Sequence, residues 1–284
     1  MPRMRAFSQR LSRGRVGAWS YGICESQGFQ PHMEDAHLVA QPTQASVLLG
    51  VFDGHNGAFV ANFLKTHILS LFRSSEPFSA KHYAEALKVA LLSADEVLRM
   101  QKQDLGYTGA TATLAFLLGH TLHVANLGLC KAVVSHKGRA KVLTQDHLAV
   151  GSAERKRIEE AGGFVCDQTR KINRVHFEFS RSIGDFALKD PTSPILSAEA
   201  SVTSYELGVD DNFLMLGTEG LWDGRCPQEV VLLLEKNRDQ TMDCSKVCAD
   251  LCSRLSRCST KKDFMYLPGK IGTANMTCIF LTRA

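Results

Sequence analysis

Long apolar runs are missing from this 284-residue sequence, and so are segments rich in proline, glycine and serine. No apolar run approaches the roughly 20 residues of a membrane-spanning helix, which argues against an integral membrane protein. Neither a linker nor an internal repeat divides the chain, so we expect one large domain. With 44% hydrophobic and 22% charged residues, the composition is that of an ordinary globular protein.

Acidic residues are absent from positions 1–19, which contain five arginines. The net charge of +4 therefore divides into +5 for this start and −1 for the remainder, and a near-neutral body argues against a nucleic-acid-binding face. Two interpretations of the basic start remain open: a flexible arm over residues 1–18, or a short mitochondrial transit peptide. We expect the arm, followed by one domain over residues 19–284. We expect the protein in the cytoplasm or nucleus, with a mitochondrial location as the alternative that the Arg-rich start leaves open.

A signal-peptide core is also missing, so the nine cysteines are expected to be reduced thiols. Cys244, Cys248 and Cys252 recur every fourth residue and would form one stripe on a helix. The paired, closely spaced cysteines typical of zinc sites are absent. We interpret the stripe as a packed helix face, with metal binding as the alternative.

Hydrophobic periodicity predicts the order of the elements. Strands are expected at 19–24, 36–40, 45–52, 108–118, 120–126, 131–135, 212–217 and 275–281, and helices at 58–72, 78–100, 153–161, 228–236 and 243–255. Short connections between the middle strands indicate antiparallel hairpins. Because strands and helix pairs alternate in blocks, the pattern predicts an α+β fold of two antiparallel sheets with helices outside.

One stretch, Val51-Phe-Asp-Gly-His-Asn-Gly57, places polar groups where a buried strand gives way to a helix. At such a corner Asp53 can bridge divalent cations, the Gly54 carbonyl can add a hard oxygen, and His55 can donate a proton. The alternative is a plain turn in which Asp53 caps the helix. A second acidic cluster, Met33-Glu34-Asp35-Ala36-His37, favours a metal site.

Six motifs, in this order, resemble the protein phosphatase 2C family of metal-dependent Ser/Thr phosphatases and span about residues 19–282: Gly28 to His37, Val51 to His55, Thr144 to His147, Glu154 to Gly163, Ser180 to Asp185, and Gly220 to Asp223. The resemblance implies an α-β-β-α sandwich and a site for two Mg²⁺ or Mn²⁺ ions that dephosphorylates phosphoserine and phosphothreonine. It also implies an irregular flap over residues 164–195, with Arg181 and Asp185 fastening its base; the alternative is that both are solvated charges.

Several family positions are intact. Glu34 and Asp35 match the acidic pair that orders metal ligands and their waters, and Asp53 matches the bridging carboxylate. Gly54 matches the carbonyl ligand, His55 the proposed general acid, and Asp223 the second acid of the Asp-Gly-x-Trp-Asp motif.

Four other positions depart from the family pattern. Gln30 replaces the phosphate-binding arginine, and a neutral amide cannot supply its charged bidentate grip. Leu129 replaces the acid that helps hold a third metal, and Ala274 replaces another metal-binding carboxylate. Glu219 replaces aspartate with a side chain one methylene longer, which Mg²⁺ tolerates poorly and Mn²⁺ somewhat better.

These departures predict a pseudophosphatase that binds one Mg²⁺ or Mn²⁺ ion, at Asp53 and Gly54, and acts through a protein or phosphoprotein partner. The first alternative is an active phosphatase with an altered metal site. The second is a structural subunit whose basic start contacts an acidic partner such as RNA, the only route by which we expect nucleic acid to bind.

Overall fold

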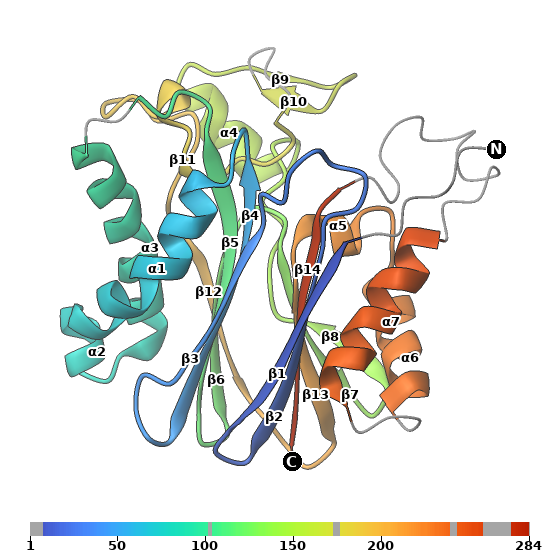
Figure 1. Cartoon of the computed structure of the whole chain (residues 1–284). Coiled ribbons are helices and arrows are strands. Elements are labelled where there is room, and N and C mark those ends of the chain that lie inside the picture. The colour runs from blue at the N-terminus through green and yellow to red at the C-terminus, as the bar shows by residue number, and fades with distance from the viewer. Residues whose placement is uncertain (1–7, 102–103, 173–176, 239–242, 258–273, 284) are drawn as a thin grey trace.

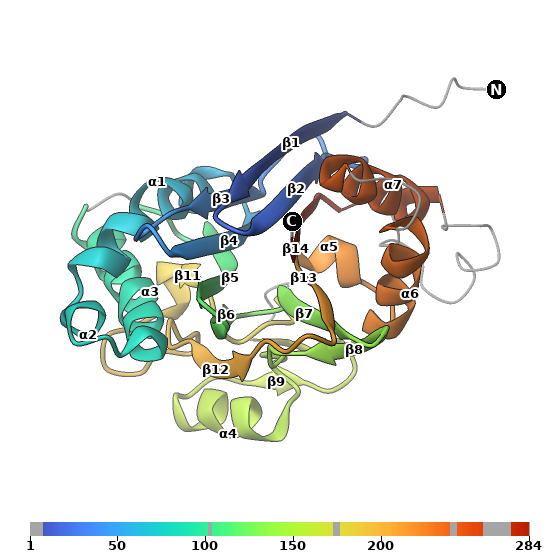
Figure 2. The same ribbon diagram turned by 90° about the horizontal axis from the view of Figure 1, so that it is seen from below.

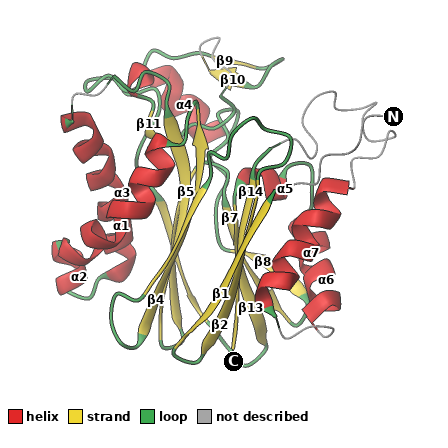
Figure 3. Cartoon of the chain, in the orientation of Figure 1, coloured by secondary structure: helices red, strands yellow, loops and turns green. Residues whose placement is uncertain are grey.

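The computed structural model describes residues 8–101, 104–172, 177–238, 243–257 and 274–283. Two antiparallel sheets lie face to face, and helices cover both outer faces, as Figures 1 and 3 show. The predicted α+β sandwich of two sheets between helix layers is therefore confirmed. Within the described residues, no helix has the length and apolar character needed to cross a bilayer.

The first sheet has the order β1-β2-β14-β13-β7-β8. Its strands are Gln9–Val16 (β1), Trp19–Ser26 (β2), Met276–Arg283 (β14), Asp211–Gly217 (β13), Lys131–His136 (β7) and Arg139–Val142 (β8). The second sheet has the order β12-β6-β5-β4-β3, and a short strand, β11, pairs with β5. Its strands are Ser201–Glu206 (β12), Thr121–Leu127 (β6), Gly109–Leu118 (β5), Ser46–His55 (β4), Ala36–Ala40 (β3) and Ile183–Gly184 (β11).

Helices close the two outer faces and the upper end. Phe59–Ser74 (α1), Glu76–Ser79 (α2) and Tyr83–Met100 (α3) cover the second sheet, and Pro227–Arg238 (α6) and Cys244–Arg257 (α7) cover the first. At the upper end of Figure 1 lie Ser152–Glu160 (α4), the hairpin Val165–Cys166 (β9) and Lys171–Ile172 (β10), and Glu219–Trp222 (α5). A 3₁₀ turn, Phe186–Leu188, follows β11.

Strand β4 shows why the apolar run of the sequence becomes a central strand. Leu48 and Phe52 pack beneath α1 and α3, whereas Leu49 and Val51 pack between the sheets. Both faces of the strand are thus buried, which requires a continuous apolar run in place of strict alternation. By the same period of two, Asp53 falls on the side of Leu49 and Val51.

The basic start differs from the expectation of a flexible arm over residues 1–18. Gln9–Val16 form β1, which pairs along its whole length with β2 through a two-residue turn. The strand was not recognised because most of its residues are exposed and polar, so no apolar alternation marks it. Positions 1–7 lie outside the described residues. Two further exposed strands, β8 and β12, were missed for the same reason.

Two other boundaries need correction. The predicted helix 78–100 is divided into α2 and α3, because Ser75 caps α2 and Lys81 adopts a positive φ of 62° that no helix continues through. The strand expected to end at Phe52 runs on to His55, since β5 still pairs with it there. Helix α1 begins only at Phe59 with Ala58 as its N-cap, so the alternative in which Asp53 caps this helix is wrong.

The cysteine stripe of α7 packs inward, as the packed-face interpretation predicted. Cys244, Cys248 and Cys252 are buried in the apolar cluster between α7 and the first sheet. All the cysteines that the structure describes are free thiols, and Cys258 lies outside the described residues. Burial raises the pKa of the Cys248 thiol, which makes it a weak metal ligand and a weak nucleophile.

Candidate functional site

The upper rim of the sandwich collects the acidic positions predicted from the sequence. Asp35 lies directly before β3, and Asp53 lies near the end of β4, opposite Thr111 of β5. Glu219 begins α5 and is separated from the end of β13 by one residue. The rim is therefore supplied by both sheets. Three segments distant in sequence meet there.

Asp35 is a buried carboxylate with one satisfied oxygen. Its Oδ2 accepts a hydrogen bond of 2.8 Å from the Thr218 hydroxyl, whereas its Oδ1 is buried without a hydrogen-bond partner. Burial raises the pKa of Asp35 to about 7, and the hydrogen bond from Thr218 offsets only part of that increase. Ionised Asp35 thus lowers the stability of the fold, unless the carboxyl is protonated or a cation binds to it.

Asp53 lies beside Asp35 and is likewise a buried carboxyl with a raised pKa. Its Oδ2 accepts a hydrogen bond of 2.9 Å from the backbone N–H of Glu219. Burial and the charge of Asp35 raise the pKa of Asp53 well above its ordinary value, despite this hydrogen bond. Two like charges at one site favour protonation of one of them, or a bound cation.

Gly54 is required by the close approach of the loop before β3. A Cβ on Gly54 would lie 2.4 Å from the Glu34 carbonyl oxygen, so no larger residue fits. The same loop is fastened by Asn275, whose Oδ1 accepts the Glu34 N–H at 2.8 Å and whose amide donates to the carbonyls of Gln27 and His32. Asn275 therefore fixes where the Glu34–Asp35 pair enters the rim.

His55 pairs with the flap. Its Nε2 lies 2.8 Å and 3.0 Å from the two carboxylate oxygens of Asp185, and Ser182 donates a hydrogen bond of 2.5 Å to the same carboxylate. Because a carboxylate only accepts, Nε2 carries the proton. The rings of Phe177 and Phe179 each lie 5.0 Å from the imidazole. The predicted fastening of the flap by Asp185 is confirmed, with His55 as its partner.

The α5 side of the rim offers fewer charged groups. Asp223 ends α5, and its backbone N–H donates to the Glu219 carbonyl at 2.9 Å. Ala274 lies beside Gly220, with its methyl 3.0 Å from where a Gly220 Cβ would be. The structure thus places a methyl group where the resemblance implies a carboxylate. The Glu219 backbone N–H joins this side of the rim to Asp53 through its hydrogen bond.

The two remaining departures have different surroundings. Gln30 is exposed, and its carbonyl accepts a hydrogen bond of 2.8 Å from the Gln27 side chain. Leu129 is only 7% exposed and belongs to an apolar cluster beneath the flap, together with Ile158, Phe177 and Phe179. The leucine therefore contributes to the packing of the flap, where an acid would be surrounded by apolar side chains.

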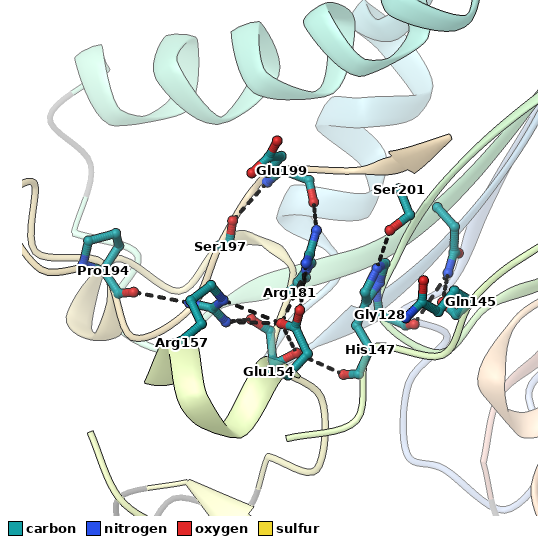
Figure 4. A network of polar contacts seen from close by, with 12 residues as sticks. Gly128, Gln145, His147, Glu154, Arg157, Arg181, Pro194, Ser197, Glu199 and Ser201 are labelled. Carbon is teal, nitrogen blue, oxygen red and sulfur yellow. Dashed lines mark hydrogen bonds and ion pairs between the residues drawn. The ribbon is translucent and has the colours of Figure 1, made fainter. Parts of the chain in front are cut away.

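The base of the flap is a dense polar network around Glu154 of α4 (Figure 4). Arg181 binds both Glu154 oxygens through Nε, at 3.1 and 3.2 Å, and Nη2 contacts Oε1 at 2.5 Å. Arg157 and the Ser180 hydroxyl also donate to Glu154, and Arg181 Nη1 donates to the Glu199 carbonyl at 2.7 Å. The predicted fastening by Arg181 is confirmed, and the alternative of a solvated charge is wrong.

In this network two arginines, Arg181 and Arg157, compensate the single charge of Glu154. Burial by itself would raise the pKa of Glu154, but hydrogen bonds from Arg181 and Ser180 and the charges of Arg181 and Arg157 outweigh it and lower this pKa to about 2. His147 lies next to the network, accepts the Gly128 N–H at Nδ1 and contacts the Ser201 hydroxyl through Nε2. Burial and the charge of Arg181 lower the pKa of His147 to about 4, so the ring is neutral.

Sequence reasoning missed three residues of the rim. Thr218 donates to Asp35, and Asn275 fixes the loop of Glu34, although neither carries charge. Thr277 places a buried hydroxyl without a hydrogen-bond partner in the same region as the unpaired Asp35 oxygen. The only available signal was adjacency, since Thr218 precedes Glu219 and Asn275 follows Ala274.

A metal site can be tested against this donor set. The described residues contain no group of three or more His, Cys, Asp and Glu side chains placed to hold an ion. The unpaired Asp35 oxygen and the adjacent Asp53 carboxylate nevertheless fit a single cation, because both are buried acids with raised pKa values. The two carboxylates thus offer oxygen ligands of the kind that a divalent cation prefers.

Comparisons with known proteins agree on one family. A family profile described as "Protein phosphatase 2C" matches residues 19–261. "Protein phosphatase 2C homolog 2" of Schizosaccharomyces pombe is 33% identical over 82% of this chain and 66% of its own length. The Hypocrea jecorina protein of the same description is 32% identical over 92% of this chain and 61% of its own length. The chain therefore spans between three fifths and two thirds of these relatives.

Solved structures share the fold at low identity. The crystal structure of serine-threonine phosphatase 2C from Toxoplasma gondii has a TM-score of 0.80 at 18% identity, and covers 98% of this chain and 99% of that one. The structure of a C. elegans sex determining protein has a TM-score of 0.77 at 19% identity, over 97% of this chain and 64% of that one. These likenesses concern the arrangement of sheets and helices.

Proposed function

Because this chain belongs to the protein phosphatase 2C family, we propose that it is a pseudophosphatase domain that binds at most one divalent cation and acts by binding a protein or phosphoprotein partner. One observation carries the proposal: the Ala274 methyl lies beside Gly220 and Leu129 is buried in the apolar cluster beneath the flap, so neither position offers an oxygen ligand. Family phosphatase chemistry depends on preorganised positive charge at the phosphate, and this rim contributes mainly negative charge.

The cation would be Mg²⁺ or Mn²⁺, held by Asp53 and the Gly54 carbonyl with Glu34 and Asp35 close by. When bound, such an ion supplies positive charge that neutralises the carboxylates and polarises a phosphate oxygen. The residues of this chain do the rest: Asn275 fixes the loop of Glu34, and Thr218 orients Asp35. Of the family's metal-binding positions in the C-terminal half, Glu219 and Asp223 still carry acids that could support a second ion.

Three departures then limit turnover. Gln30 cannot clamp a dianionic phosphate with charge. Ala274 offers no oxygen ligand, and Leu129 is buried in the apolar cluster beneath the flap. The rim retains a place for phosphate beside a cation, but not the groups that stabilise charge in the transition state.

One observation favours the second candidate, an active phosphatase with an altered metal site. His55 keeps a protonated Nε2 against the Asp185 carboxylate, an arrangement that can orient a proton donor. This pair also has a structural interpretation, because it fastens the flap.

The deciding experiment measures turnover and metal binding on the same preparation. The purified chain is assayed with a phosphothreonine peptide and an aryl phosphate in Mg²⁺ and in Mn²⁺, and each metal is titrated calorimetrically. We expect a turnover rate equal to that of Asp53→Asn, and a one-site isotherm that Asp53→Asn abolishes. Turnover that Asp53→Asn removes, or two bound ions, would establish the active phosphatase instead. Asp167→Asn, which changes an exposed acid that pairs with Arg155, is the matched control.

A further inference from the structure

Strand β1 is the outer edge of the first sheet. It stands at the end of the order β1-β2-β14-β13-β7-β8, and among the described strands it pairs only with β2. In Figure 2 it lies along the outer edge at the top of the view, with α7 next to it. An edge strand exposes a row of unpaired backbone N–H and C=O groups that another strand can bind.

The phase of the pairing identifies which residues face outward. The Gln27 N–H donates to the Ser8 carbonyl at 3.2 Å, so this pair faces inward. Antiparallel pairs alternate between bonded and non-bonded, and the two-residue turn likewise closes on the bonded pair of Val16 and Trp19. The outward backbone groups therefore belong to the alternate residues between these limits: Gln9, Leu11, Arg13 and Arg15.

The side chains of the same residues lie on the face of the sheet that carries α7. Gln9 Nε2 donates to the Ser253 hydroxyl of α7 at 3.3 Å, and Arg13 forms an ion pair with Asp243 at the start of α7. The Arg13 side chain is still 65% exposed, and Leu11 is 48% exposed. An added strand would thus meet both open backbone groups and accessible side chains.

The charge of β1 selects the partner. The strand Gln9–Val16 carries Arg10, Arg13 and Arg15 and no acid. A second copy of this chain would bring three more arginines to the same edge, which disfavours pairing of like edges. Nucleic acid offers negative charge but no backbone that repeats at the spacing of a β-strand. An extended acidic peptide satisfies both the charge and the open backbone groups.

We propose that β1 is a strand-addition site for an acidic extended peptide of the pattern acid-x-acid-x-apolar, bound antiparallel to it. The two acids would lie opposite Arg15 and Arg13, and the apolar residue would lie opposite Leu11, because directly opposed residues share one face. Main-chain hydrogen bonds to the outward groups supply affinity, and the side chains supply specificity. The site is separate from the rim and does not depend on the proposed function there.

The test uses the full chain and a labelled peptide, Ser-Asp-Thr-Glu-Thr-Val-Ser, blocked at both ends. Binding is followed by fluorescence anisotropy, and amide hydrogen exchange is measured with and without peptide. We expect new protection at the amides of Leu11, Arg13 and Arg15. The amides of Ser12 and Gly14 already bond to β2 and should not change.

Two variants separate charge from backbone pairing. The double variant Arg13→Glu/Arg15→Glu should weaken binding about tenfold and gain affinity for the peptide in which lysine replaces both acids. Leu11→Pro removes one outward N–H and leaves the inward ladder intact, so it should lose binding and retain the fold. Arg139→Glu, on the opposite edge strand β8 of the same sheet, is the matched control and should bind as the parent does.

Three results would overturn the proposal. The first is peptide binding without protection of the outward amides. The second is a dimer in sedimentation experiments that the double variant dissolves, which would make a second copy the occupant. The third is displacement of the peptide by single-stranded RNA at equal charge, together with undiminished binding by Leu11→Pro, which would show a purely electrostatic surface.

Discussion

The rim and the flap base both contain buried carboxylates supplied by family motifs, yet the protein treats their charge in opposite ways. At the flap base, Glu154 receives hydrogen bonds from Arg181, Arg157 and Ser180, and its pKa is lowered to about 2. At the rim, Asp35 and Asp53 lie next to each other, no lysine or arginine of the described residues forms an ion pair with either, and burial raises the pKa of both.

This difference in charge compensation has opposite consequences for the stability of the fold. A carboxylate that the chain itself neutralises stabilises the fold at neutral pH, because the unfolded state offers no such partners. A carboxylate that the chain leaves uncompensated costs stability at neutral pH until a cation binds. The comparison therefore assigns the flap base to the scaffold and supports the proposal that the rim binds a cation, and five experiments sharpen it.

The largest effect is expected from restoring the charge pattern of the rim. The triple variant Gln30→Arg/Glu219→Asp/Ala274→Asp should gain at least about a hundredfold in turnover of a phosphothreonine peptide, the low end of what one positioned charge contributes. Each single reversal should do little, because an isolated carboxylate only adds repulsion to Asp53. A parent chain that the triple variant does not improve would contradict the pseudophosphatase proposal.

A fourth reversal, Leu129→Asp, is expected to act differently. It is the substitution that would restore the third metal. The structure buries this side chain in the apolar cluster beneath the flap, so the aspartate should lower the free energy of unfolding before it adds any rate. Denaturant melts of the triple and quadruple variants distinguish the two effects.

At the flap base, Arg181→Ala should lower the free energy of unfolding by about 3 kcal/mol, since it leaves Glu154 buried with one partner fewer. Arg155→Ala, in the same helix α4 as Glu154, is the matched control: Arg155 pairs with Asp167, whose side chain is 81% exposed, so its loss should change the free energy of unfolding far less. Equal urea concentrations at the unfolding midpoint for the two variants would mean that the flap base adds no stability.

At the rim, Asp35→Asn should stabilise the metal-free protein. The pKa of Asp35 is about 7 in the folded chain against an ordinary 3.8, so ionisation costs stability progressively as the pH rises through this window. The variant should gain on the order of 2 kcal/mol at pH 8 and less at pH 5. Saturating Mn²⁺ should reverse the order by stabilising only the parent. Thermal melts in chelator and in Mn²⁺ provide the measurement, and an unchanged order in Mn²⁺ would argue against a cation at this carboxylate.

The smallest effect concerns acid pH at the flap base. The pKa of Glu154 is depressed from 4.5 to about 2, so its stabilisation is complete above pH 4.5 and declines as the pH falls toward 2. Between pH 4.5 and 3.5 the parent should lose about 1 kcal/mol that Glu154→Gln does not lose. Urea midpoints of both proteins over this range measure the difference, and parallel curves would show that Glu154 is not ionised in a favourable network.

Particular elements show how far the sequence predicted the fold. Strands β3 and β5 and the helices α4 and α7 were expected within a few residues, because apolar periodicity marks them. The sequence pattern does not predict strands β1, β8 and β12, because their residues are mostly exposed and their place depends on a neighbouring strand.

The same contrast applies to the site. The motifs placed Asp35, Asp53 and Glu219 at strand ends and identified Gln30, Leu129 and Ala274 as departures. They did not show that Leu129 packs beneath the flap or that Asp185 pairs with His55. Those contacts join residues more than a hundred positions apart or bury a side chain under a distant segment, and no local pattern encodes them.

What the sequence by itself determined is the inventory: the family motifs, the order of buried strands and helices, and the charge that each position carries. Those properties are local, because periodicity and side-chain chemistry are read along the chain. Only the tertiary structure decided how the charges are compensated. Glu154 and Asp53 are both acids in motifs, but one folds against two arginines and the other against a second aspartate. The pKa of a buried group depends on the neighbours that folding brings to it, so one carboxylate is compensated by the chain itself and the other is left without such compensation.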